Sequence, residues 1–353
     1  MDGTITRTKT SQGRLSTILL LAVVLTCVAV GLAAHRTPVI ANHVAREVER
    51  QRALNGKFFY NDGFLDDGDY VLVGQLPKAN YTRGGVYFIG ASETKNALRP
   101  WELPPAERAL IHNYSLGDLR HRDVLHYVRS LVEEDGLLKA GGKKTTVVLG
   151  LSYQMTRSRH LSNVNDRYVP MLFERHGFYT YDIEDGIRRR PMSDVERFLQ
   201  VERIRAQRFL QVLVSPPDDV SLEHETPREG HDYLVTAMGE NWRQEMERQV
   251  AYVAEVIDYL QARGVHVRVI FPPEASWHES LPFDDTYRAL LKPILESRKV
   301  PSSDLKRLLR DTEFSDAVHA RYTGEIKLHN AYRAIALQSL ADMGTKLQPL
   351  LTR

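Results

Sequence analysis

The stretch Gly85-Val-Tyr-Phe-Ile-Gly-Ala-Ser92 decides the fold, because an almost wholly apolar run leads directly into a turn of small residues and a serine. A strand that is buried on both faces of a parallel sheet has this composition. Residues 145–150 and 265–271 repeat the pattern, and residues 70–73 form a further short run rich in strand-forming residues. The sequence therefore predicts an α/β protein with a mainly parallel sheet.

Segments with helical periodicity separate these predicted strands. Residues 125–138 and 241–263 carry apolar side chains at helical spacing, and Gly264 ends the second segment. Strand, helix and strand in this order form a βαβ pattern. The alternation breaks into a charged stretch after Ser158, so we expect an insertion at about 158–240. It is partly helical, over residues 193–213, and caps the functional edge of the sheet.

Length, charge and cysteine content exclude several classes of protein. The 353 residues are enough for one enlarged α/β domain. The formal net charge is +2, and Arg7, Lys9 and Arg14 against Asp2 supply 3 − 1 = +2 of it, so the rest of the chain is balanced. A nucleic-acid partner therefore has no electrostatic support. A single cysteine, Cys27, excludes disulfide scaffolds and cysteine-based zinc sites.

The N-terminal region predicts a membrane anchor. Residues 15–34 contain no charged side chain, and about twenty apolar residues match the hydrocarbon thickness of a bilayer. Positive charge precedes this run, so we expect residues 1–14 in the cytoplasm and the C-terminal domain outside, in the periplasm or at the cell surface. A cleaved signal peptide and a lipidated Cys27 are the alternatives. Residues 35–80 would form a stalk or lead-in, with a helix over 38–55.

Ser92 is the candidate nucleophile. Its hydroxyl follows a buried strand and begins a helix, where the main-chain N–H groups favour a developing oxyanion. A serine at this place can also be a simple helix cap. A hydroxyl nucleophile needs a base and a group that orients the base.

Asp and His three residues apart could supply both of these groups. The chain has three such pairs, Asp118/His121, Asp123/His126 and Asp316/His319. The first two lie in a charged segment that leads into an amphipathic helix, which is typical of a solvated helix face. Asp316/His319 lies in a non-periodic stretch before a terminal helix and is the best placed. We expect no cofactor and no metal, because the histidine spacing fits no compact ligand set.

These residues together resemble the SGNH, or GDSL-like, hydrolase superfamily across residues 85–335, within a catalytic domain that we expect over residues 81–345. Gly90-Ala91-Ser92 is similar to the nucleophile block, with Ala in place of Asp. Asn113 with Gly117 is similar to the second block, and Asp316-Ala-Val-His319 matches the last. Gly150-Leu-Ser152 stands at the third block but has Ser where the family has its oxyanion Asn.

The resemblance implies a three-layer sandwich and a set of roles. Ser92 would be the nucleophile, His319 its base and Asp316 the group that orients His319. The oxyanion would be bound by Ser92, Gly117 and Ser152, with Asn113 as a supporting residue behind them.

An anchor followed by an exported domain of this kind is also similar to membrane-anchored members that accompany cell-envelope acylation, of the D-alanyl transfer and alginate O-acetylation types. The expected function is that of a serine esterase or O-acyltransferase with an acyl-enzyme. Its expected partners are an acyl donor, a cell-surface polysaccharide or other hydroxyl acceptor, membrane lipid through residues 15–34, and a membrane-embedded acyl-transfer protein. The alternative is a catalytically degenerate assembly or binding factor, which the replacement of Asn by Ser152 favours.

Overall fold

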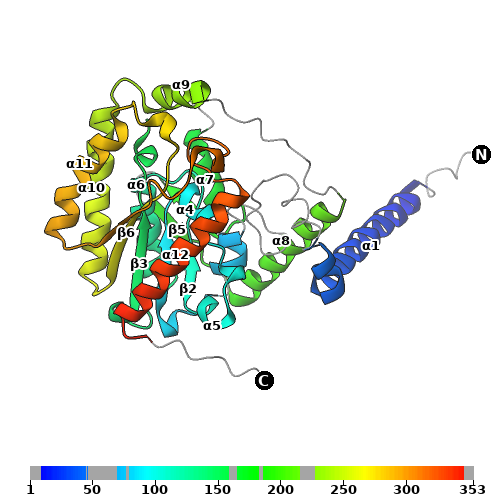
Figure 1. Ribbon diagram of the computed structural model, residues 1–353. Helices are drawn as coiled ribbons and strands as arrows, with labels where there is room; N and C mark the ends of the chain where they lie inside the picture. The colour runs from blue at the N-terminus through cyan, green and yellow to red at the C-terminus, as the bar shows by residue number, and fades with distance from the viewer. Residues whose placement is uncertain are drawn as a thin grey trace, which may run out of the picture.

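The structure is a computed structural model of the chain, shown in Figure 1. It describes residues 9–44, 46, 70–76, 79–158, 165–182, 186–214 and 227–345. Most of the predicted stalk, including its helix beyond residue 44, lies outside these residues.

The centre of the fold is a five-stranded sheet in which all neighbouring strands are parallel. The strand order is β2-β1-β3-β6-β7. Their bounds are β1 Gly85–Ile89, β2 Ile111–Asn113, β3 Thr145–Gly150, β6 His266–Phe271 and β7 Ser302–Asp304. The prediction of an α/β fold with a mainly parallel sheet is confirmed.

Helices cover both faces of this sheet (Figure 1). Within β1, Val86 and Phe88 pack toward one face and Tyr87 and Ile89 toward the other, as the pleat of a strand requires. The first face carries α4 Ser92–Ala97 and α12 Tyr322–Asp342, and the second carries α6 His121–Glu133, α10 Trp242–Gln261 and α11 Phe283–Ser297. The short helices between them are α5 Pro105–Arg108 and the turns Tyr81–Arg83, Pro100–Glu102, Gly142–Lys144, Tyr153–Thr156, Ser276–His278 and Asp311–Glu313.

The segment predicted as an insertion contains more than helices. Its elements are α7 Asn165–Glu174, the antiparallel hairpin β4 Tyr179–Asp182 and β5 Gly186–Arg189, α8 Asp194–Val214 and α9 Pro227–Met238. Helix α8 covers the helix predicted over 193–213. The hairpin is absent from the sequence prediction, since the charged run Arg188-Arg-Arg190 hides the alternation of a strand.

One predicted strand is wrong. Residues 70–73 lie in a single π-helical turn, Tyr70–Gln75, and take no part in the sheet. Val71 and Val73 are fully buried and Leu72 nearly so, so the turn is enclosed on all sides. A short run that is apolar at every position cannot distinguish a buried strand from a buried helical turn.

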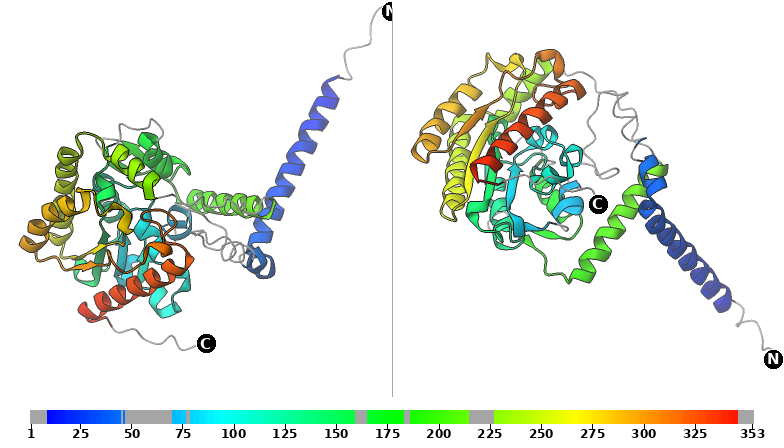
Figure 2. Two further views of the ribbon diagram at one scale, coloured as in Figure 1. Left: turned by 45° about the horizontal axis from the view of Figure 1, so that its top comes forward. Right: turned by 60° about the horizontal axis from the view of Figure 1, so that its bottom comes forward.

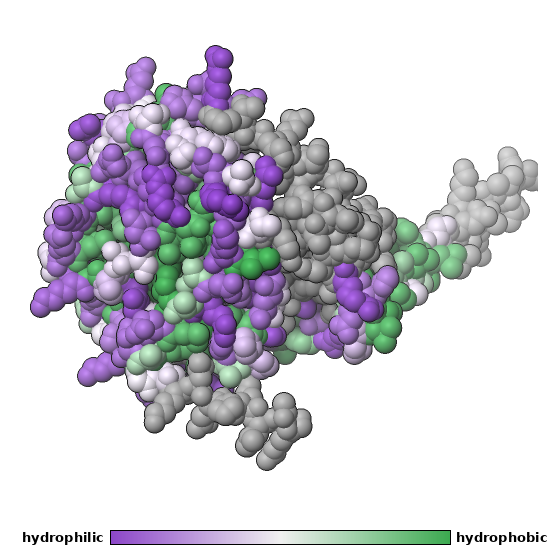
Figure 3. Space-filling model, viewed as in Figure 1, coloured by the Kyte–Doolittle hydropathy of each residue, from purple (hydrophilic) through white to green (hydrophobic). Residues whose placement is uncertain are grey.

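Helix α1, Lys9–Arg36, extends away from the sheet domain. The C-terminal end of α1 contacts α8 (Figure 2). Gly31 allows this approach, because a side chain there would contact Leu210 of α8, and Arg36 forms an ion pair with Glu202 at 2.9 Å. Apolar side chains gather along α1, as Figure 3 shows, and Ile18 and Leu21 are more than half exposed. Within the described residues, no helix combines the length and the apolarity that a membrane crossing requires.

Candidate active site

Ser92 begins α4 directly after β1, at the edge where the parallel strands end. Helix α4 sits very close to the strand ends. A Cβ at Gly150 would overlap the side chain of Thr94, and one at Gly90 would meet both Thr94 and the main-chain oxygen of Gly150. Only glycine at these two positions lets the helix that carries Ser92 lie so low over the sheet.

His319 is presented by a tight loop before α12. The loop closes on itself through an antiparallel bridge between Phe314 and Ala320, and Ser315 donates both its main-chain N–H and its hydroxyl to the main-chain oxygen of His319, at 2.8 and 2.9 Å. The N–H of Ala275, after β6, bonds the oxygen of Ala317 at 2.9 Å. The loop is therefore fixed to the sheet edge.

Ser92, His319 and Asp316 form one hydrogen-bonded chain. The Ser92 Oγ lies 2.8 Å from His319 Nε2, and His319 Nδ1 lies 2.6 Å from Asp316 Oδ2. The other oxygen of Asp316 accepts the main-chain N–H groups of Val318 at 2.9 Å and His319 at 2.7 Å. The side chains of His319 and Asp316 keep 33% and 34% of their surface exposed, so the chain is open to solvent.

The pKa values of His319 and Asp316 are shifted in the directions expected for a base and an ionised partner. Burial acts to lower the pKa of His319, but the hydrogen bond and charge of Asp316 outweigh it and raise that pKa above its ordinary value. Burial acts to raise the pKa of Asp316, and its hydrogen bonds with His319 and the loop N–H groups reverse the effect and lower it. Asp316 is therefore ionised at neutral pH and stabilises the imidazolium form of His319.

The three residues predicted to bind an oxyanion lie at the same edge of the sheet. Ser92 opens α4, and Gly117 is buried in the loop after β2, where the neighbouring Leu116 N–H bonds the oxygen of Gly90 at 3.1 Å. Ser152 follows β3 and caps the Tyr153–Thr156 turn, since its hydroxyl accepts the Gln154 N–H at 3.2 Å.

Asn113 has a structural task. Its side chain is fully buried, and its amide nitrogen donates to the main-chain oxygens of Thr94, Lys95 and Leu98 at 3.0–3.1 Å, while its oxygen accepts the Ser115 N–H. Asn113 thus fastens the C-terminal end of the helix that carries Ser92 to β2.

Members of the two other Asp/His pairs have partners away from Ser92. His121 is buried and bonds the Tyr287 hydroxyl at 2.8 Å, and Asp118 forms an ion pair with Arg157. Asp123 accepts the main-chain N–H of Arg120 and the hydroxyl of Tyr181, both at 3.0 Å. In the part of the chain that the structure describes, no group of three or more metal-ligating side chains is present.

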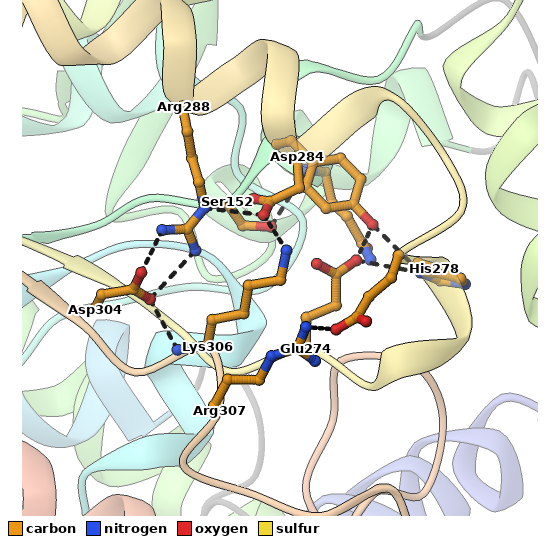
Figure 4. A network of polar contacts seen from close by, with 11 residues as sticks. Ser152, Glu274, His278, Asp284, Arg288, Asp304, Lys306 and Arg307 are labelled. Carbon is orange, nitrogen blue, oxygen red and sulfur yellow. Dashed lines mark hydrogen bonds and ion pairs between the residues drawn. The ribbon is translucent and has the colours of Figure 1, made fainter.

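A narrow pocket of about 10 Å³ is lined by the chain neighbours of Ser92 and His319, which are Glu93 and Val318. Its walls include Glu93, Ser152, Val318, Glu274, Asp284 and Arg288. Figure 4 shows the polar network on one side of it, in which Arg288 pairs with Asp284 at 2.9 Å and with Asp304 at 2.7 Å. A larger cavity of about 490 Å³ between α11 and β7 shares only Phe271 and Arg288 with this pocket and contains none of the predicted site residues.

Sequence reasoning missed the charged walls of this pocket. Glu274 stands three residues after β6, so inspecting the residue that follows each strand could have found it. Glu93 is adjacent to Ser92 but reads as an ordinary acidic residue in the first turn of a helix. Asp284 and Arg288 are four residues apart on α11, which is also the spacing of an ordinary ion pair on a helix surface. Their other partners, Lys306 and Asp304, lie 22 and 16 residues away and leave no local pattern.

Comparisons with known proteins leave the family open. No protein-family model and no curated protein sequence matches the chain. Among solved structures, a candidate acylhydrolase from Bacteroides fragilis is similar over 80% of this chain and 99% of its own, at 14% identity and a TM-score of 0.38. The Bacillus subtilis protein YXIM is similar over 76% of this chain and 58% of its own, at 13% identity and a TM-score of 0.32. Similarities this weak identify neither the function nor the site.

Proposed function

We propose that the protein is a serine esterase or O-acyltransferase that acts through an acyl-enzyme on Ser92. One observation carries the proposal: the Ser92 Oγ lies 2.8 Å from His319 Nε2, whose other nitrogen lies 2.6 Å from Asp316. A hydroxyl next to a base, with the base oriented by a carboxylate, is the arrangement that activates serine for attack on an ester.

The proposed reaction has two halves. In the first, the Ser92 O–H bond breaks as its proton moves to His319 Nε2, the Oγ attacks the ester carbonyl, and the carbonyl electron pair moves onto oxygen. When this oxyanion collapses, the leaving alcohol takes the proton from His319 and an acyl-Ser92 ester remains. In the second half, water or an acceptor hydroxyl gives its proton to His319 and attacks that ester, which forms a second oxyanion. When this oxyanion collapses, the bond between the acyl carbon and the Ser92 Oγ breaks, His319 returns the proton to the Oγ, and the free acid or the acylated acceptor leaves.

The oxyanion donors proposed are the N–H groups of Ser92 and Gly117 and the hydroxyl of Ser152. Ser152 can take this part because its oxygen accepts the Gln154 N–H, which leaves its own hydrogen available to donate. Loss of one oxyanion donor typically costs about 10²–10³ in rate.

The location and substrate are also proposals. The uncharged run 15–34 supports a membrane anchor, with the domain outside the cytoplasm and a cell-surface polysaccharide or other hydroxyl compound as acceptor. A membrane-embedded protein that delivers the acyl group would fit this location.

The competing proposal is a non-catalytic envelope assembly factor. It is favoured by Ser152, a weaker oxyanion donor than an amide side chain and one that already caps a turn.

Covalent labelling with a fluorophosphonate probe separates the two proposals. We expect the full-length protein to be labelled, Ser92→Ala to lose labelling completely, and His319→Ala to be labelled far more slowly. Ser302→Ala, which changes an exposed serine on β7, should label like the wild type. A folded wild-type protein that takes up no probe would refute the enzymatic proposal. Acyl transfer to a polysaccharide, measured against hydrolysis, then separates transferase from esterase.

A further inference from the structure

Glu93 is a buried carboxylate beside the candidate nucleophile. Its side chain is only 7% exposed, and the Ser92 hydroxyl lies 3.4 Å from its Oε2. Carboxylates that are this deeply buried are almost always ion-paired. Among the described residues, however, the Ser92 hydroxyl is the only hydrogen-bond or ion-pair partner of Glu93. A buried carboxylate is therefore held beside Ser92 without a cation paired to it in the described part of the chain.

The place of Glu93 in the fold gives no structural reason for the charge. An acidic residue in the first turn commonly stabilises a helix through its dipole, but α4 has only six residues and little dipole to stabilise. The side chain instead forms part of the wall of the pocket, together with Ser152 and Val318.

We propose that Glu93 is a further catalytic residue, whose carboxylate stabilises the positive charge that His319 acquires when it takes the proton of Ser92. The inference rests on the proposed function of Ser92. The imidazolium would form between two carboxylates, with Asp316 on Nδ1 and Glu93 on the side of Ser92. An opposite charge at this range favours the protonated base, and the low polarity of a buried site strengthens the effect.

The charged groups around His319 agree with this role. Asp316 and then Glu93 act to raise the pKa of His319, and Lys95, also on α4, acts to lower it. Burial raises the pKa values of Tyr287 on α11 and Tyr332 on α12, and the charge of Glu93 adds a smaller contribution in the same direction.

A charge in this place also affects which acyl groups can react. Glu93, Glu274 and Asp284 line the pocket against one guanidinium, that of Arg288, which is already paired with Asp284 and Asp304. The pocket wall is therefore net negative, and an acyl group that carries its own carboxylate would be repelled. The substrate class that fits is an ester of an uncharged acyl group.

The test is the pH profile of kcat/KM for p-nitrophenyl butyrate, measured on the full-length protein in detergent. Glu93→Gln keeps the shape of the side chain and removes its charge. We expect the acidic limb of the profile to move down by about 0.5–1 pH unit, because the base loses one favourable charge. Glu240→Gln is the control. It makes the same change at an exposed glutamate outside the pocket and should leave the limb in place. An unchanged limb in folded Glu93→Gln would overturn the inference.

A second measurement needs no variant. p-Nitrophenyl hemisuccinate has an acyl chain as long as that of the butyrate but ends in a carboxylate. We expect the wild type to prefer the butyrate by about tenfold or more, since one pKa unit of interaction energy corresponds to a factor of ten. Equal rates for the two esters would also overturn the inference. Ser92→Ala distinguishes a failure of the Glu93 inference from a failure of the proposed function. We expect this variant to lose all activity, and activity that survives the change would refute the proposed function itself.

Discussion

Asp118 and Arg157 form an ion pair that joins the loop after β2 to the loop after β3. Asp118 has a left-handed main-chain conformation, with φ of 59°, and directly follows Gly117. Arg157 ends the turn that begins at Ser152. The pair therefore connects the two loops that carry the proposed oxyanion donors Gly117 and Ser152.

Breaking this ion pair should affect activity more than stability. Both side chains are 24% exposed, and pairs at such positions contribute about 1 kcal/mol or less to the free energy of unfolding. For Arg157→Ala we expect kcat to fall about tenfold, because a loosened oxyanion donor costs less than a missing one. Ester hydrolysis and urea unfolding measure the two effects. An exposed arginine without a role in these loops, Arg243→Ala, is the control. Wild-type kcat in Arg157→Ala would show that the pair does not position the loops.

The raised pKa of His319 sets the expected pH dependence. The imidazole accepts the Ser92 proton only in its neutral form, so activity is present above the pKa of His319 and is lost as the pH falls through it. Because Asp316 raises this pKa above 6.5, the acidic limb of kcat/KM should lie above pH 6.5. A midpoint clearly below 6.5 would mean that burial outweighs Asp316.

Asp316→Asn tests the interaction between Asp316 and His319 by removing the charge of the carboxylate. The amide cannot stabilise an imidazolium and favours the wrong tautomer of His319, so we expect kcat to fall by about 10³–10⁴. The main-chain N–H groups of Val318 and His319 can still bond the amide oxygen, so the loop should keep its shape. Ester hydrolysis gives kcat, and the rate of fluorophosphonate labelling reports the reactivity of Ser92 separately. A loss below tenfold would remove Asp316 from the proposed mechanism.

The sequence indicates the residues near the nucleophile because their relation is local. Ser92 follows its strand directly, and Asp316 and His319 are three residues apart, so the distance along the chain already limits their geometry.

Other parts of the site depend on distant contacts and leave no such pattern. Tyr153 bonds Glu274 across 121 residues, and the pairing of Arg288 with Asp304 depends on how α11 packs beside β7. Similarly, the Tyr70–Gln75 turn is helical because of what encloses it, which its own composition does not reveal.

Asn113→Ala should destabilise the protein strongly. The change removes an amide that bonds three main-chain oxygens of α4 and leaves these groups short of donors in a fully buried place. Leaving buried polar groups unsatisfied costs about 1–3 kcal/mol each, so we expect a loss of about 2–4 kcal/mol in the free energy of unfolding by urea. Asn241→Ala, at an exposed helix start without a side-chain cap, should change it by less than about 1 kcal/mol. Equal effects of the two changes would contradict the fastening role of Asn113.

The membrane anchor is tested by adding charge to residues 15–34. An arginine at the centre of a membrane helix costs about 2.5–3.5 kcal/mol, so Leu21→Arg combined with Val24→Arg should release the protein from membranes on alkaline carbonate extraction. The wild type should stay in the membrane pellet. Val39→Arg, which changes a 76% exposed residue beyond the uncharged run, should behave like the wild type. If the double variant stays in the pellet as well, residues 15–34 do not hold the protein in the membrane. Wild type that is released into the supernatant, shortened by the length of the run, would instead support the cleaved signal peptide.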